Sequence, residues 1–268
     1  TAKGTMGITN EGTIENGTYT ARGNFTYTDT AEASLKDGTL ISEEGKAKIT
    51  AHGVLQIKKL SAKDSATVEA DHDVTLTEAE AGTLAISSGG SVNAGTLTAT
   101  TGDAKVKAKT NVTIGTLTAE TGGATIEATD AALDVTTLNA KSLTAKAGTT
   151  LSAKTLDVKE HAKLSSGGDM VLTEAHANTL TANAGGKLTA TTLGVTGAAG
   201  MTSGGAMEVT DANVGSVAAK AGTTLHVKKL TSTGEATLTS KDEAKLDDVI
   251  AGTLAAESTT GSVNAGTL

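Results

Sequence analysis

Apolar and polar residues alternate in short runs along most of the chain. Runs such as AKVKA (104–108), TLTAE (116–120) and ATIEA (124–128) place Val, Ile, Leu or Ala at every second position. Alternation at period two, over about 4–6 residues rich in Thr, Val, Ile and Leu, predicts short β-strands. Turn-forming stretches, including TTGD (100–103) and SSGGD (165–169), separate the runs. An all-β chain is therefore predicted, and its density of Thr and Gly disfavours long helices.

The runs themselves recur. Leu97 matches Leu117, and Val106 matches Ile126, both at a spacing of 20. Wider matches, at spacings of 21 or 24, pair Leu143 with Leu164, Leu151 with Leu172, Leu60 with Leu84 and Leu230 with Leu254. Units of roughly 18–25 residues with two or three strands are typical of a solenoid, in which each turn packs against its neighbours.

A long block of the chain occurs twice. GSVNAGTL stands at 90–97 and again at 261–268, while LQIKKL (55–60) returns as LHVKKL (225–230). The offset in numbering is 170 for the second pair and 171 for the first. At about 21 residues a turn, this amounts to about eight whole turns. Insertion of whole turns preserves stacking, so the duplication supports a solenoid.

These patterns predict a right-handed parallel β-helix, or β-solenoid, of about 12–13 coils of roughly 18–25 residues. With a strand spacing of about 4.8 Å, the predicted length is roughly 60 Å. We expect residues 46–268 to form one continuous, regular solenoid. Residues 1–45 are expected to form less regular N-terminal coils or a junction.

Composition restricts what fills this core. The chain has no Pro, Cys or Trp, so Leu, Val, Ile, Ala and Thr methyl groups must pack inside narrow coils. Its three aromatic residues, Tyr19, Phe25 and Tyr27, cluster within 17–30. Two interpretations stay open for them. They are larger fillers of a wider coil or cap, or they form an aromatic ligand-binding platform.

Charge and hydropathy exclude several functions. The net charge of −8 is spread along the chain, and Arg22 is the one arginine. We therefore predict no nucleic-acid partner, which would need a basic face with Arg and aromatic stacking. No apolar run approaches the ~18 residues of a membrane span. The lack of Cys excludes disulfides and thiolate metal sites. With no signal peptide at its start, the sequence is expected to be an interior piece of an exported protein.

The repeats resemble those of filamentous haemagglutinin-type exoproteins, the passengers of two-partner secretion systems. The resemblance covers about residues 46–268 and rests on KSLTAKAGTTLSAKTLDV (141–158), LTANAGGKLTATTLGV (180–195) and VAAKAGTTLHVKKL (217–230). It implies an adhesin or the stalk of a contact-dependent inhibition toxin, located extracellularly or on the bacterial cell surface. It also implies an outer-membrane transporter as partner. The family's secretion domain carries Asn-Pro motifs, and no Pro occurs here.

Parallel β-helices also include pectin-degrading enzymes, so paired carboxylates are candidates for a catalytic site. Asp247 and Asp248 could act as general acid and base. Two motifs accompany such pairs in these enzymes, Gly-His-Gly and Arg-x-Lys. Gly-His-Gly does not occur here, and Arg-x-Lys is absent because the one arginine, Arg22, is followed by Gly23 and Asn24. We interpret the pair as a solvated turn and predict that the chain is not an enzyme.

Asp71, His72 and Asp73 are a candidate site for a divalent cation, with a solvated turn as the alternative. On a strand only the two Asp side chains would converge. The five histidines show no metal-ligand spacing. We predict no metal and no cofactor.

Thr-Leu-Thr occurs five times, first at 75–77, 96–98 and 116–118. At spacings of 21 and 20 these three could stack as an outward Thr ladder. Such ladders present a surface to ice in several antifreeze proteins, but β propensity and cross-strand pairing also explain them. The later copies lie at 179–181 and 237–239.

The sequence therefore favours a structural rod segment that projects a binding or toxin module from a bacterial surface. The alternative is an adhesin whose rod surface binds a host or neighbouring-cell receptor, protein or glycan. Polysaccharide cleavage and ice binding are less favoured. Open strand edges at the ends of a solenoid predict end-to-end self-association.

Overall fold

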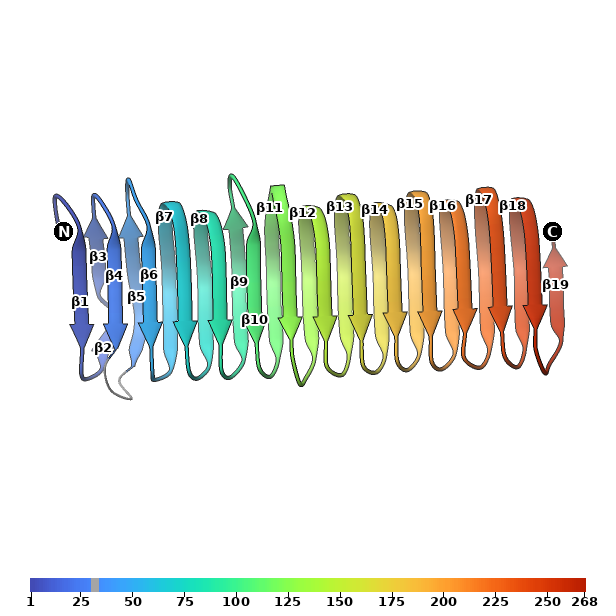
Figure 1. Cartoon of the computed structure of the whole chain (residues 1–268), viewed down its shortest axis with the longest axis horizontal. Helices are drawn as coiled ribbons and strands as arrows, with labels where there is room; N and C mark the ends of the chain where they lie inside the picture. Colours follow the sequence, from blue (N-terminus) through green and yellow to red (C-terminus); the bar gives the residue numbers. More distant parts are fainter. Residues whose placement is uncertain (30–33) are drawn as a thin grey trace. The chain divides into compact units, whose positions relative to one another are not determined.

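The fold is all-β. The computed structural model describes residues 1–29 and 34–268, which contain 19 strands and no helix. Every described strand pairing is parallel, and strands of successive turns lie side by side (Figure 1). The predicted parallel β-solenoid is thus confirmed, with about 14 turns instead of 12–13. Within the described ranges, no helix has the length and hydropathy of a membrane span.

The chain divides into two compact units, residues 1–135 with 139–141 and residues 136–138 with 142–268. Strands in unit 1 are short at first and longer from β7 onward. They are β1 (Met6–Asn10), β2 (Ile14–Glu15), β3 (Thr18–Ala21), β4 (Phe25–Asp29), β5 (Leu35–Ser42), β6 (Ala47–Ala51), β7 (Leu55–Ala70), β8 (Val74–Ser88), β9 (Val92–Ala99), β10 (Ala104–Ala108) and β11 (Val112–Ala128). β12 (Leu133–Ala147) contributes to both units.

Unit 2 consists of long strands, each of which follows most of one turn. They are β13 (Leu151–Ser166), β14 (Met170–Ala184), β15 (Leu188–Ser203), β16 (Met207–Ala221), β17 (Leu225–Ser240), β18 (Ala244–Ser258) and the shorter β19 (Val263–Thr267). The pattern within each long strand is buried–exposed alternation, interrupted at the corners of the turn. This is the period-two pattern that the sequence predicts.

Turns from β13 to β18 alternate between two lengths that differ by a single residue. Leu151 pairs with Met170, Met170 with Leu188 and Leu188 with Met207. The difference arises at one corner, where the register shifts in every pairing along these strands. Three residues separate the inward positions there in β13, β15 and β17, and two in β14, β16 and β18. Two turns together make one repeat, which runs from Leu188 to its equivalent Leu225.

This register corrects several sequence matches. Leu97 does pair with Leu117, and Val106 with Ile126, as predicted. Leu151, however, pairs with Met170 and not with Leu172. The matches of Leu60 with Leu84 and of Leu230 with Leu254 are also wrong, because Leu60 pairs with Ala79 and Leu230 with Val249. Since the turns are shorter than predicted, the offset between LQIKKL and LHVKKL corresponds to about nine turns instead of eight.

The core of each unit is a stack of small aliphatic side chains. In β13 the inward residues come in groups, Leu151 with Ala153, then Leu156 with Val158, then Ala162 with Leu164, all at most 3% exposed. Each buried Leu or Val contributes about 1.5–3 kcal/mol of transfer free energy. Because inward residues stack on inward residues of the next turn, stabilisation accumulates turn by turn.

A ladder of glycines at another corner of unit 2 sets how closely the turns approach. A Cβ atom at Gly167, Gly185, Gly204 or Gly222 would lie 2.1 Å from the carbonyl oxygen of the glycine one turn earlier. No side chain fits at that distance, so these four positions require glycine. The SSGGD (165–169) turn predicted from sequence is therefore one rung of this ladder.

Candidate functional site

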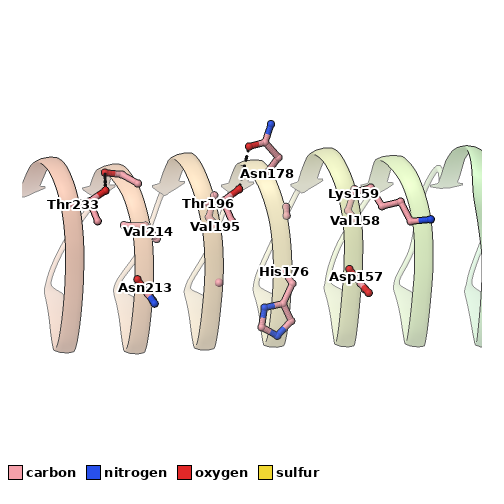
Figure 2. A pocket seen from close by; sticks show the side chains of 13 residues that line it. Asp157, Val158, Lys159, His176, Asn178, Val195, Thr196, Asn213, Val214 and Thr233 are labelled. Atoms are coloured by element: carbon pink, nitrogen blue, oxygen red, sulfur yellow. Dashed lines mark hydrogen bonds between the residues drawn. The ribbon is translucent and has the colours of Figure 1, made fainter.

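The candidate site is an open groove of about 500 Å³ on unit 2 (Figure 2). It crosses five successive turns, from β13 to β17, and lies beside the corner where the register shifts. Its lining residues occupy equivalent positions of each turn. They are Asp157, Val158, Lys159, His176, Ala177, Asn178, Gly194, Val195, Thr196, Asn213, Val214, Gly215 and Thr233.

One wall is a ladder of outward side chains. Asp157 pairs with His176, His176 with Gly194 and Gly194 with Asn213. Alternation turns all four positions outward, since each stands between two buried residues. Gly194 leaves room for the histidine ring, because a Cβ there would lie 2.4 Å from His176 Nδ1. The ladder therefore lacks a side chain at Gly194, and the His176 ring lies against that position.

The corner supplies further polar groups. Thr196 Oγ1 donates a hydrogen bond to Asn178 Oδ1 over 3.1 Å, and Thr233 Oγ1 donates to the carbonyl oxygen of Gly215 over 3.3 Å (Figure 2). His176 Nε2 lies 3.1 Å from Glu174 Oε1. Val195 and Val214 close the floor, at 1% and 2% exposed. The lining of the groove therefore offers amide, hydroxyl and imidazole groups, with one carboxylate and one ammonium group.

The aromatic residues predicted as a ligand platform lie elsewhere, in unit 1. Phe25 and Tyr27 are each 1% exposed and fill the core. The Tyr27 hydroxyl accepts a hydrogen bond from Asn10 Nδ2 at 3.0 Å, and burial raises the pKa of Tyr27. Tyr19 is half-buried and its ring lies against Gly17. Of the three rings only Tyr19 has substantial exposure, so a ligand-binding role there stays a prediction.

The Asp247–Asp248 pair does not converge on a common site. Asp247 Oδ2 lies 2.8 Å from His226 Nε2, and its Oδ1 lies 3.2 Å from Lys245 Nζ. The hydrogen bonds from His226 and Lys245 lower the pKa of Asp247. A carboxyl group with a lowered pKa is a poor general acid near neutral pH. Asp248 pairs in register with Lys229.

Asp71 and Asp73 bond to different turns. Asp71 Oδ2 lies 2.6 Å from His52 Nδ1 of the preceding turn, and this hydrogen bond raises the pKa of His52. Asp73 Oδ1 accepts the Ser91 N–H of the following turn at 2.7 Å. Across residues 1–29 and 34–268, no group of three or more His, Cys, Asp or Glu side chains is arranged to hold a metal ion.

The expected three-turn Thr ladder is wrong. Thr96 and Thr98 pair with Thr116 and Thr118. The stretch 75–77 is out of line with them, since Glu78 and Glu80 occupy the preceding rung. The ladder therefore has two consecutive rungs at this place, with carboxylates next to it.

Sequence reasoning missed the groove. The available signal was the double-turn repeat, which aligns SSGGDMVLTEA (165–175) with TSGGAMEVTDA (202–212) and so relates each turn of this stretch to the second turn after it, but not to its immediate neighbour. The hollow itself depends on Gly194 lying next to His176.

No protein-family model, no curated protein and no solved structure matches this chain.

Proposed function

We propose that this chain is a structural spacer segment of a large bacterial exoprotein, and that it projects a binding or toxin module away from the cell surface. The observation that carries the proposal is the repeated parallel register of unit 2, in which each turn pairs with the turn before and the turn after it. Such a stack gains length by whole turns, at about 4.8 Å each, without altering existing contacts.

The resemblance to filamentous haemagglutinin-type repeats supports the wider setting. On that basis the protein is secreted through an outer-membrane transporter and works outside the cell or on its surface. The proposal assigns no catalytic reaction to the segment. The segment contributes length and resistance to unfolding. The core of stacked aliphatic residues supplies the resistance to unfolding.

Deletion of one double turn tests the spacer function. Removal of residues 188–224 joins Lys187 to Leu225, which takes the place of Leu188 on Met170. We expect a folded protein that small-angle X-ray scattering finds about 10 Å shorter, or two strand spacings. The control deletion, residues 188–215, removes one whole turn and part of the next, and should lose cooperative unfolding. Equal disruption by both deletions would refute a modular spacer.

A second candidate function is ligand binding in the groove. The Asn, Thr and His side chains that line it suit a hydroxyl-rich ligand such as a glycan, which makes the segment itself an adhesin. A glycan array probed with the full chain tests this. Binding that is lost in His176→Ala and Asn213→Ala but kept in Thr202→Ala, outside the groove, would support an adhesin. Equal binding by all the variants would count against it.

A further inference from the structure

The outward ladder of the groove lacks a side chain at its middle turn. Gly194 lies one turn after His176 and one turn before Asn213, so it separates these two residues (Figure 2). The flanking residues are therefore two strand spacings apart, about 9.6 Å. We call the space over Gly194, between His176 and Asn213, the central cell. A pyranose ring fits a gap of this width.

His176 presents a hydrogen-bond acceptor to the central cell. Its Nε2 lies 3.1 Å from Glu174 Oε1, and because a carboxylate only accepts, Nε2 carries the hydrogen. In the neutral imidazole, Nδ1 is then the acceptor. A Cβ atom at Gly194 would collide with Nδ1, so this nitrogen faces the cell. Since no group in residues 1–29 and 34–268 bonds to Nδ1, a ligand hydroxyl over Gly194 can donate to it.

Two amide groups supply donors around the same cell. Asn213 is exposed, and no described residue forms a hydrogen bond with its side chain. At the corner, Asn178 Oδ1 accepts from Thr196 over 3.1 Å, which leaves the Nδ2 hydrogens of Asn178 as donors. A hydroxyl group both donates and accepts, so a ligand with several hydroxyls satisfies the acceptor and the donors together.

Charge in and around the groove favours a neutral ligand. The charged lining residues, Asp157 and Lys159, belong to β13, two turns before Gly194. The carboxylate of Glu174 bonds to the His176 ring at one side of the central cell. An anionic sugar in the cell would be repelled by this carboxylate. The polar lining and the nearby negative charge together indicate a neutral sugar.

The shape of the groove favours an extended ligand. Its lining residues occupy equivalent positions of five successive turns, so polar groups recur at about 4.8 Å along the stack. An extended β-linked glycan chain advances by a similar distance with each sugar, whereas an α-linked chain coils away from a straight ladder. A β-linked chain can therefore place successive sugars on successive turns.

We propose that the groove binds a neutral, extended β-linked oligosaccharide along the stacking direction, with one pyranose ring seated over Gly194 between His176 and Asn213. One ligand hydroxyl donates to His176 Nδ1, and the Asn213 amide donates to an oxygen of the same ring. This inference rests on the ligand-binding function proposed for the groove, to which it adds the class of ligand and a defined subsite.

Isothermal titration calorimetry with the full chain tests the proposal. The β-linked probes are cellotetraose and chitotetraose, and the α-linked control is maltotetraose. Gly194→Ala adds one methyl group to the central cell, and Asn213→Ala removes a donor. Gly200→Ala is the matched control, because Gly200 lies in the same strand outside the groove and the nearest atom to an added Cβ is 3.9 Å away. Thermal melts followed by circular dichroism check that each variant folds.

We expect saturable binding of at least one β-linked probe and no binding of maltotetraose. Binding should be about tenfold weaker to Gly194→Ala and about fivefold weaker to Asn213→Ala, while Gly200→Ala should bind like the unaltered chain. The proposal is overturned if neither β-linked probe binds, if maltotetraose binds equally well, or if Gly194→Ala keeps full affinity.

The glycan array separates failure of this subsite from failure of the groove as a binding site. A glycan of another class that binds the unaltered chain but not His176→Ala would overturn the subsite alone and keep the adhesin function. Absence of any binding on the array and in the titrations would overturn both.

Discussion

Nζ of Lys228 lies 3.0 Å from Oε1 of Glu208, on the strand one turn earlier. Lys187 Nζ approaches the other oxygen of the same carboxylate at 3.3 Å. One glutamate in β16 therefore joins lysines on both sides of its strand. Because the two ammonium groups hydrogen-bond to the carboxylate, the pKa of Glu208 is lowered.

This network predicts a stability contribution that depends on pH. A carboxyl group with a lowered folded-state pKa stabilises the fold above its unfolded-state pKa of about 4.3, and the contribution disappears as pH falls through the folded-state pKa. Urea denaturation at pH 6 should therefore find Glu208→Gln less stable than the unaltered chain, with the difference shrinking toward pH 3. Replacing both lysines by Met should return the pKa of Glu208 toward its ordinary value, as measured by NMR titration.

The glycine ladder predicts a position-dependent cost of adding one methyl group. Gly204→Ala would place Cβ 2.1 Å from the Gly185 carbonyl oxygen, so the turns must separate. We expect a loss of about 1–3 kcal/mol of unfolding free energy. At Gly200 the nearest atom to an added Cβ is 3.9 Å away, so Gly200→Ala should change stability by less than about 0.5 kcal/mol. Equal effects in chemical denaturation would refute the steric account.

Replacement by alanine should change the stability of the fold differently at two equivalent serines. Ser203 Oγ donates to the Gly205 carbonyl at 2.9 Å. Ser240 lies two turns later in the same register, and its buried hydroxyl oxygen bonds to no described group. Ser203→Ala should cost about 1 kcal/mol, while Ser240→Ala should be neutral or stabilising. Thermal melts of the two variants provide the comparison, and a larger loss for Ser240→Ala would contradict it.

The alternating Leu and Met ladder of unit 2 predicts the cost of a cavity. Leu188 is 0% exposed between Met170 and Met207. Leu188→Ala should lower the unfolding free energy by about 2–5 kcal/mol. Met170→Leu keeps the volume and should cost less than about 1.5 kcal/mol. Urea denaturation measures both, and similar losses for the two would show that the ladder tolerates voids.

Sequence alone was enough for the fold class, because alternation at period two and recurrence at about 20 residues leave few alternatives to stacked parallel strands. The pairing of Leu97 with Leu117 and of Val106 with Ile126 followed directly from their spacing. The buried positions of Phe25 and Tyr27 also agree with the alternation, since both stand at inward sites of β4.

Register in unit 2 emerges only once the chain is folded. Matching Leu151 to Leu172 instead of Met170 is a slip of two positions, which leaves every side chain on its proper face. The period-two pattern of the sequence therefore cannot distinguish the two registers. The corner, with its alternation of three and two residues, fixes the pairing through backbone hydrogen bonds. The groove depends on that register, because only a particular alignment sets Gly194 beside His176.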